Sequence, residues 1–249
     1  MNANPQEQHY ETIHDAYAAH YYDHASNDYR RRFVMAPLLH GLDLNNCTVA
    51  ELACGDGHNS VLLKEIFPSV RTEGFDLSPK ACRQYELNTG LPAHKLDLTA
   101  SAELESRFDA AFIIGGLHHC VADLPATLRN TAALLKPGAK FLMYEPSANF
   151  MLEPLRKAWY RADKYFDVET ERALDHAELV AAADGRFKVE RVFYIGGPAY
   201  FMILNSLVTR IPIKWKNGLA KPLDGDEAVW NKLPGRFACP VFGANRTRL

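Results

Sequence analysis

The residue types that could bind a cofactor stand in one short turn, ELACGDGHNS at residues 51–60, which follows an apolar run. Gly55 and Gly57 allow the backbone to turn sharply and to approach a ligand, because neither carries a Cβ. A helix that starts behind them offers free N–H groups. Asp76 lies 21 residues beyond Gly55, at the end of the next apolar run, where a carboxylate can accept hydrogen bonds from both hydroxyls of a ribose. The spacing indicates a nucleoside-binding site.

Two classes of cofactor bind to turns of this kind. The dinucleotide fingerprint G-x-G-x-x-G is nearly matched by Gly55, Gly57 and Ser60, and it would indicate an NAD-linked oxidoreductase. The run from Glu51 to Gly57 resembles the first motif of the class I S-adenosylmethionine-dependent methyltransferases, whose usual form is (Asp/Glu)-x-Gly-Cys-Gly-x-Gly. The chain departs from this motif at Ala53, where the family usually has glycine. Alanine is small enough to keep the turn.

Four further segments resemble the same family, in the same order and spacing. GFDLSP at 74–79 resembles its ribose-binding segment, and LDL at 96–98 resembles its adenine-binding segment. Residues 108–119 resemble its fourth strand and the loop that follows, and LLKPG at 134–138 resembles the loop before its fifth strand. The resemblance spans residues 48–146. It implies a doubly wound α/β fold with a mainly parallel seven-stranded sheet and a helical cap.

The resemblance also implies which residues hold the cofactor, S-adenosylmethionine, and its product S-adenosylhomocysteine. Asp76 binds the ribose hydroxyls and Leu77 packs on the adenine. Asp97 accepts from the adenine amino group, and the N–H of Leu98 donates to a ring nitrogen. Asp97 could instead only cap the next turn. The glycine-turn residues Ala53, Gly55 and Gly57 pass beneath the ligand.

At the methionine end of the cofactor, the resemblance implies contacts from three parts of the chain. Glu51 orients the glycine turn and reaches the methionine amino group through water, while Ile114 and Gly115 offer their backbone. Tyr17 and Tyr22 belong to an N-terminal lid, in which related small-molecule methyltransferases carry a similar Ala-x-x-Tyr-Asp segment. The alternative for both tyrosines is a half-buried place on an amphipathic helix.

Candidate catalytic and substrate-binding residues follow the fourth and fifth apolar runs. His118 and His119 come where this family places the transferred methyl group, and a histidine there could take a proton from a hydroxyl or an amine. Alternatively, one ring packs under the cofactor and the other caps the next helix. Tyr144 and Glu145 end the fifth strand at the ligand-binding edge of the sheet and are predicted to face the substrate. The alternative for Glu145 is a helix N-terminus.

The elements that must position these residues divide the chain into three parts. Residues 1–45 are predicted to form a helical lid, and residues 46–148 a cofactor-binding core of alternating strands and helices. Residues 149–249 are expected to complete the sheet and to carry a helical insertion that caps the substrate. The predicted strands are 48–53, 70–75, 93–96, 108–114, 141–144, 187–195 and 237–244, and the predicted helices include 124–135, 151–161, 177–183 and 200–209.

Two surface segments have several interpretations. The run Tyr29 to Arg32 is predicted to be a solvated helix face, with an anion site as the alternative. The apolar and basic segment 199–216 is predicted to form a lid or the core of a homodimer. It could also be a pocket wall or, through its tryptophan and lysines, a contact with a membrane surface.

Composition excludes several other classes of protein. Hydrophobic residues make up 47% of the chain and the net charge is −2, so we expect a folded protein that does not bind bulk nucleic acid. Five cysteines without a C-x-x-C pair argue against a disulfide framework and a structural zinc site, and no metal is expected. The sequence shows no signal peptide and no transmembrane segment, which favours a cytoplasmic protein.

The sequence therefore predicts a methyltransferase that acts on an oxygen or nitrogen of a small molecule, guessed to be a sugar, a polysaccharide precursor or a secondary metabolite. Two alternatives remain, an NAD-linked oxidoreductase and a non-catalytic module that binds S-adenosylmethionine. The identity of the acceptor, the oligomeric state and the role of residues 196–235 stay open.

Overall fold

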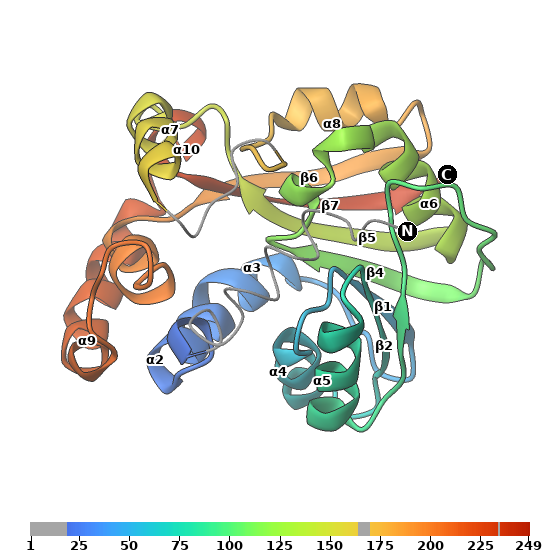
Figure 1. Ribbon diagram of the computed structural model, residues 1–249, viewed down its shortest axis with the longest axis horizontal. Coiled ribbons are helices and arrows are strands. Elements are labelled where there is room, and N and C mark those ends of the chain that lie inside the picture. Colours follow the sequence, from blue (N-terminus) through green and yellow to red (C-terminus); the bar gives the residue numbers. More distant parts are fainter. Residues whose placement is uncertain (1–18, 164–169, 234) are drawn as a thin grey trace.

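The computed structural model describes residues 19–163, 170–233 and 235–249. One predicted site residue, Tyr17, lies outside these ranges. In the described part, a single central sheet carries helices on both faces, and a group of helices stands at one end of it (Figure 1).

The sheet has seven strands in the order β3-β2-β1-β4-β5-β7-β6. The first five are parallel to one another, and β7 pairs antiparallel with both β5 and β6. The prediction of a mainly parallel seven-stranded sheet is therefore confirmed. The strands are β1 (Thr48–Leu52), β2 (Arg71–Asp76), β3 (Ala93–Lys95), β4 (Phe108–Ile114), β5 (Leu135–Pro146), β6 (Phe187–Ile195) and β7 (Val241–Arg248).

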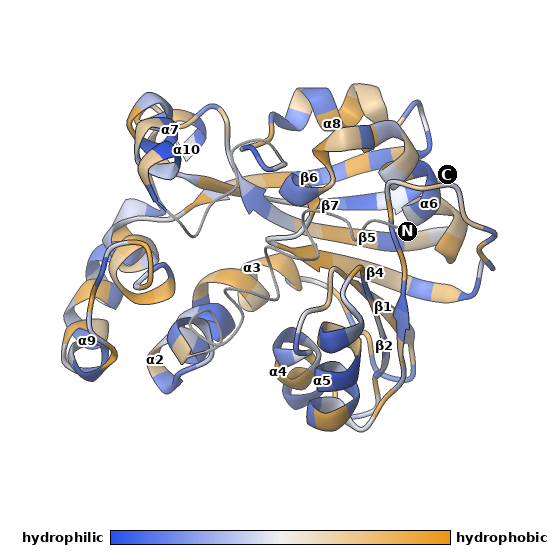
Figure 2. Ribbon diagram, in the orientation of Figure 1, coloured by the Kyte–Doolittle hydropathy of each residue, from blue (hydrophilic) through white to orange (hydrophobic). Residues whose placement is uncertain are grey.

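The two faces of the sheet pack against different helices, because the central strands are apolar on both sides. On one face, Leu128 of α6 (Leu124–Leu134) and Leu179 of α8 (His176–Ala182) join the main core. On the other face, Leu38 of α3 (Ala36–Leu38) and Leu63 of α4 (His58–Ile66) pack on the strands. Helix α5 (Pro79–Thr89) contacts α4, β2 and β3. Hydrophobic residues gather in the central strands, whereas α4 and α5 turn hydrophilic residues outward (Figure 2).

The N-terminal helices are joined to the late insertion by a third apolar cluster. It includes Tyr29 of α2 (His24–Tyr29) and Ile203 of η4 (Tyr200–Leu204), a short π-helix. Lys216 of α9 (Ile213–Trp230) is fully buried. Its ammonium group donates to the carbonyl of His20 at 2.7 Å and contacts the carboxylate of Asp23. The lid and the insertion are therefore tied together by a buried charge pair.

Several predicted elements are wrong in their details. The final strand predicted over 237–244 is formed with shifted bounds, because α10 (Gly235–Ala238) takes up residues 237 and 238 and β7 runs from Val241 to Arg248. In the segment 199–216 the apolar half packs inward at Ala199, Ile203 and Leu207, so a membrane contact through that half is wrong, whereas Trp215 is 57% exposed. The basic run 29–32 is only in part the solvated face that was predicted, since Tyr29 and Arg30 are buried whereas Arg32 is exposed.

The remaining elements are η1 (Arg30–Met35), η2 (Leu117–His119), η3 (Val121–Asp123) and α7 (Glu153–Ala162). No helix among the described residues is long and apolar enough to cross a bilayer.

Candidate functional site

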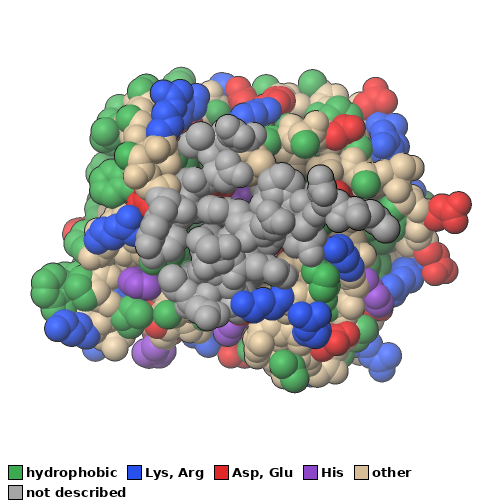
Figure 3. Space-filling model, in the orientation of Figure 1, with side chains coloured by type: hydrophobic (Ala, Val, Ile, Leu, Met, Phe, Trp, Pro, Cys, Tyr) green, Lys and Arg blue, Asp and Glu red, His purple; other side chains and the backbone are tan. Residues whose placement is uncertain are grey.

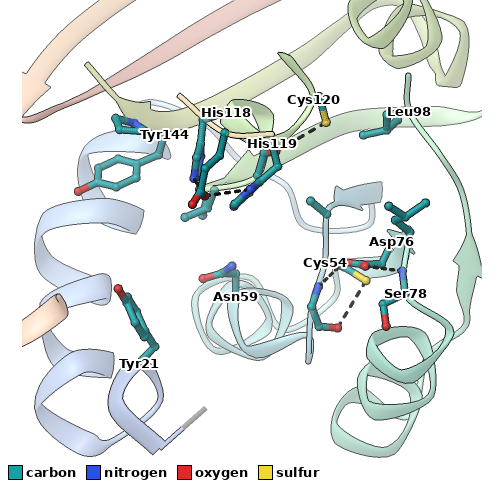
Figure 4. Close-up of a pocket in the computed structure, with 18 of the residues that line it drawn as sticks. Tyr21, Cys54, Asn59, Asp76, Ser78, Leu98, His118, His119, Cys120 and Tyr144 are labelled. Atoms are coloured by element: carbon teal, nitrogen blue, oxygen red, sulfur yellow. Dashed lines mark hydrogen bonds and ion pairs between the residues drawn. The ribbon is translucent and has the colours of Figure 1, made fainter. Parts of the chain in front are cut away.

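A pocket of about 510 Å³ lies at the carboxyl ends of the parallel strands, under the N-terminal helices and the insertion (Figure 4). Loops after β1, β2 and β4 and the end of β5 supply its floor, as expected for an open α/β sheet. Ten predicted site residues line it: Tyr22, Ala53, Gly55, Asp76, Leu77, Asp97, Leu98, Ile114, Gly115 and Tyr144. His118 and His119 line it as well.

The glycine turn is held by the end of the neighbouring strand. The N–H of Gly55 donates to the Asp76 carboxylate at 2.9 Å, and the N–H of Ser78 donates to its other oxygen at 2.9 Å. Gly57 does not line the pocket, which corrects the prediction that it passes beneath the ligand. Its φ is +77°, and a Cβ there would come within 2.7 Å of the Tyr85 ring, so glycine is required by the backbone and by α5.

Ala53 adopts a backbone conformation that alanine disfavours. Its φ is +49°, in the left-handed region that costs a non-glycine residue roughly 1–2 kcal/mol. Gly116 compensates for the extra methyl group, because a Cβ on Gly116 would lie 2.5 Å from that of Ala53. The departure from the usual glycine is therefore accommodated by a second glycine across the pocket floor.

The carboxylates that line the pocket accept hydrogen bonds from the protein and keep further acceptor positions for a ligand. Asp76 accepts one backbone hydrogen bond on each oxygen, and an ionised carboxylate has about four acceptor positions. Burial raises the pKa of Asp76 above its usual value, opposed by these backbone donors. Asp97 accepts from both the N–H and the hydroxyl of Thr99 through one oxygen, which fixes its side chain.

Glu51 stands behind the turn and does not itself line the pocket. It accepts from the N–H of Ser60 at 3.2 Å, near the start of α4, and from the amide of Asn59 at 3.2 Å. Asn59 lines the pocket and accepts from Arg30 at 2.8 Å. Burial raises the pKa of Glu51 to about 7, while Ser60, Asn59 and Arg30 oppose that shift.

Arg30 and the lid tyrosines form the wall above the turn. The Arg30 guanidinium lies 5.1 Å from the Tyr22 ring centre, and Tyr22 stacks on His58 at 3.6 Å. Tyr21 donates to Asn205 of the insertion at 2.7 Å. The sequence offered an anion site in the run Tyr29 to Arg32 only as an alternative and did not single out Arg30, because the packing of η1 on α4 is what turns that one arginine inward. It thereby places a buried positive charge beside the pocket.

Glu145 and His118 form a buried pair at the end of β5. The Nδ1 atom of His118 lies 2.8 Å from the Glu145 carboxylate. The same carboxylate accepts backbone N–H groups from Gly116, Leu117 and His118 at 3.1, 2.8 and 3.2 Å. Glu145 is fully buried and does not line the pocket, so the prediction that it faces the substrate is corrected. It caps η2 and holds the imidazole.

The electrostatics of this pair favour a neutral imidazole. Burial lowers the pKa of His118 to about 3, assisted by Arg156. Burial raises the pKa of Glu145 to about 7, against the three backbone donors. Four donors converge on the Glu145 carboxylate, which fits an ionised acceptor and a proton on Nδ1 of His118. The Nε2 atom of His118 then carries a lone pair.

Glu171 completes a group of three side chains at the rim. Its carboxylate lies 3.2 Å from Nδ1 of His119 and 3.9 Å from Nε2 of His118. The three candidate ligand atoms lie within 4.8 Å of one another, close enough to hold a metal ion. Sequence reasoning did not find this group, because Glu171 is 52 residues from His119 in a segment without a motif.

The far end of the pocket is aromatic and apolar. Tyr144 is buried, and its hydroxyl has no hydrogen bond of ordinary geometry to the described residues, although Tyr29 lies near it and donates its own proton to Glu227. Tyr200, Leu204 and Val208 line this wall, which confirms the pocket wall that was one interpretation of the segment 199–216. No motif in the sequence pointed to Tyr160, Thr170 or Val241, which line it as well.

Comparisons with known proteins agree with this geometry. Residues 50–141 match the family model described as a methyltransferase domain. No curated protein sequence matches the chain.

Three similar structures share the fold. A methyltransferase of Thermotoga maritima, described as a possible histamine N-methyltransferase, is 15% identical with a TM-score of 0.61, covering 97% of this chain and 98% of that one. Geranyl diphosphate C-methyltransferase of Streptomyces coelicolor is 14% identical with a TM-score of 0.61, covering 91% and 80%. A chain of the complex between the Haloferax volcanii Trm112 methyltransferase activator and a putative methyltransferase is 17% identical with a TM-score of 0.56, covering 99% and 95%.

Proposed function

We propose that this chain, which is a class I S-adenosylmethionine-dependent methyltransferase, transfers the methyl group to a hydroxyl oxygen of a small molecule, with His118 as the base. The observation that carries the proposal is the 2.8 Å contact between Nδ1 of His118 and the buried carboxylate of Glu145. It leaves the second nitrogen of an oriented imidazole for an acceptor in the pocket.

The pocket residues fit the cofactor. Asp76 has acceptor positions left for two ribose hydroxyls after holding the glycine turn. A Cβ built on Gly115 meets nothing within 4 Å, so the backbone there is open to a ligand. Arg30, buried and without a hydrogen bond on its Nε atom among the described residues, suits the carboxylate at the methionine end. When bound, S-adenosylmethionine supplies an electrophilic methyl group and a thioether leaving group.

His118, held by Glu145, is the base that removes the proton of a hydroxyl acceptor. A neutral amine can attack a methyl group with its own lone pair, whereas a hydroxyl must also lose its proton. As the new carbon–oxygen bond forms and the carbon–sulfur bond breaks, His118 takes that proton on Nε2. Glu145 keeps Nδ1 protonated and stabilises the imidazolium that results. A general base contributes about 10²–10⁴-fold to the rate and works best when its pKa lies near the operating pH. Because burial lowers the pKa of His118 to about 3, its contribution should lie at the lower end of that range.

The residues of the pocket wall indicate how polar the acceptor molecule is. Tyr160, Tyr200, Leu204 and Val208 offer aromatic and aliphatic contacts. The Tyr144 hydroxyl offers one further hydrogen bond to a ligand. We infer an acceptor with a mostly apolar or aromatic body and few polar groups, which favours a secondary metabolite over a bare sugar.

The test is to incubate the protein with methyl-deuterated S-adenosylmethionine and a metabolite extract, followed by mass spectrometry. The proposal expects one compound to gain a single labelled methyl group, with fragmentation placing it on oxygen. Labelling on nitrogen or carbon would refute the hydroxyl acceptor. The absence of any labelled product, with cofactor binding intact, would favour the non-catalytic module. Protection against unfolding by NADH alone would favour the oxidoreductase.

A further inference from the structure

Helix α7 leaves an apolar stripe in solvent. Leu152, Leu155 and Trp159 are 50%, 62% and 46% exposed. They stand three and four residues apart, so their side chains lie along one face of the helix. Soluble helices normally turn such a stripe inward.

The exposure of this stripe does not result from a loosely attached helix. Arg156, one position along from Leu155, donates to the carbonyls of Ser147 and Pro240 at 2.6 and 3.0 Å and to Glu153 at 2.6 Å. Tyr160 lines the substrate pocket. The stripe 153, 156 and 160 therefore anchors α7, and the neighbouring stripe 152, 155 and 159 is presented outward.

The exposed stripe continues onto α10 and the end of α9. The N–H of Met151 donates to the carbonyl of Phe237 at 2.8 Å, and the indole of Trp230 donates to the carbonyl of Ala238 at 3.2 Å. Met151, Phe237 and Trp230 are 65%, 61% and 37% exposed. We call the combined surface the cap face, made of Met151, Leu152, Leu155, Trp159, Trp230, Leu233 and Phe237.

The charges around the cap face have one dominant sign. Lys232 and Arg236 are exposed beside Leu233 and Phe237, whereas Lys157, which pairs with Glu153, and Arg161 leave α7 on the side away from Leu155 and Trp159. Asp226 is the one exposed acidic residue among the described residues 149–163, 226–233 and 235–238. The other acidic residues in these ranges, Glu153, Asp163 and Glu227, are buried. The whole chain has a net charge of −2, so the positive charge is local to this surface. Hydrophobic side chains gather along the left margin of Figure 3, with a few basic ones among them.

We propose that the cap face docks on the surface of an anionic phospholipid bilayer. Tryptophan, phenylalanine and leucine beside lysine and arginine are the combination that lies at the boundary between headgroups and acyl chains. Basic residues are attracted to anionic headgroups, each by an amount equivalent to about fivefold in binding. Pairing of two copies through this face is disfavoured, since a two-fold contact would bury the same basic residues, Lys232 and Arg236, from both copies.

Docking would place the pocket wall at the membrane. Tyr160 of α7 lines the pocket, and the side chains of Leu155 and Trp159 project from the outer side of the same helix into solvent. The inference is independent of the acceptor, since it rests on the outer surface alone.

The experiment is flotation of the full chain with two kinds of vesicle, pure phosphatidylcholine and phosphatidylcholine containing phosphatidylglycerol, without cofactor or substrate. We expect binding to the anionic vesicles that weakens with salt. The double variant Leu152→Ser/Leu155→Ser should bind at least about tenfold more weakly. Lys232→Gln/Arg236→Gln should lose about 25-fold.

Matched controls come from α5, which carries an exposed leucine and an exposed arginine far from the cap face. Leu87→Ser and Arg83→Gln make the same chemical changes there and should bind like the parent. Failure of the parent to bind anionic vesicles would overturn the proposal, as would equal binding by parent and leucine variant. A dimer in sedimentation velocity that the leucine variant abolishes, without vesicle binding, would show that the face pairs with a second copy.

Discussion

The sharpest test of the proposed base is the substitution Glu145→Gln, which keeps the shape of the side chain and changes its hydrogen bonding. The carboxylate accepts four donors: the N–H groups of Gly116, Leu117 and His118, and Nδ1 of His118. Glutamine has one carbonyl oxygen and a donating NH2 group. The amide must therefore turn its nitrogen toward one half of these donors.

The two orientations differ in cost. With its nitrogen toward Gly116 and Leu117, the amide would leave two buried N–H groups without an acceptor. With its nitrogen toward His118, only the N–H of His118 is orphaned, since the imidazole can move its proton and accept at Nδ1. Each buried N–H group without an acceptor destabilises the folded protein by about 1–3 kcal/mol, so the second orientation is the more stable one. In that orientation Nε2 carries the proton and can no longer act as a base.

We therefore expect kcat in Glu145→Gln to fall by the lower end of about 10²–10⁴-fold, with about 1–3 kcal/mol lost from the free energy of unfolding. The Kd for S-adenosylhomocysteine should stay within about threefold, because Glu145 does not line the pocket. The assay is initial rate against acceptor concentration, with calorimetry for binding and urea unfolding for stability. Glu65→Gln, at an exposed carboxylate, serves as control. An unchanged kcat in a folded, cofactor-binding variant would refute the reasoning.

Three further predictions follow from the pocket floor. Asp76→Ala should raise the Kd for S-adenosylhomocysteine about 100-fold, since two hydrogen bonds to a charged acceptor are lost; calorimetry showing equal affinity would contradict it. Ala53→Gly should raise the free energy of unfolding by up to about 1 kcal/mol by relieving the φ of +49°, and urea unfolding at or below the parent value would disprove it. The pKa of Glu51 is about 7 in the folded protein against 4.5 for an unperturbed glutamate, so protonated Glu51 stabilises the fold fully below pH 4.5, and this stabilisation is lost as the pH rises to about 7. Relative to Glu51→Gln, the parent should lose about 3 kcal/mol in the free energy of unfolding over that pH range. If the two proteins lost stability with pH in parallel, the raised pKa of Glu51 would be refuted.

The mainly parallel seven-stranded sheet and most residues that line the pocket floor could be predicted from the sequence, because their motifs are encoded locally. Strand β4 and strand β6 begin and end where their apolar runs do. The turn at Gly55 and the acid at Asp76 lie at fixed distances from strand ends, so parallel pairing brings them together at 2.9 Å.

The parts that sequence reasoning missed depend on contacts between distant segments. Glu145 was predicted to face the substrate, yet three backbone N–H groups of η2 draw it inward. Arg30 resembles its neighbours in the basic run, and only its contact with Asn59 turns it into the pocket. Lys216 was considered only as part of the basic segment 199–216, and it is buried against Asp23, 193 residues earlier. No local pattern encodes such pairings.

Chemical rescue tests the central claim most directly. His118→Gly removes the imidazole and leaves a cavity beside Glu145, so the account predicts that methyl transfer to the labelled acceptor is lost and that free imidazole restores part of it, while His119→Gly shows no such rescue. A His118→Gly protein that binds S-adenosylhomocysteine and transfers methyl groups at the parent rate without imidazole would contradict the account.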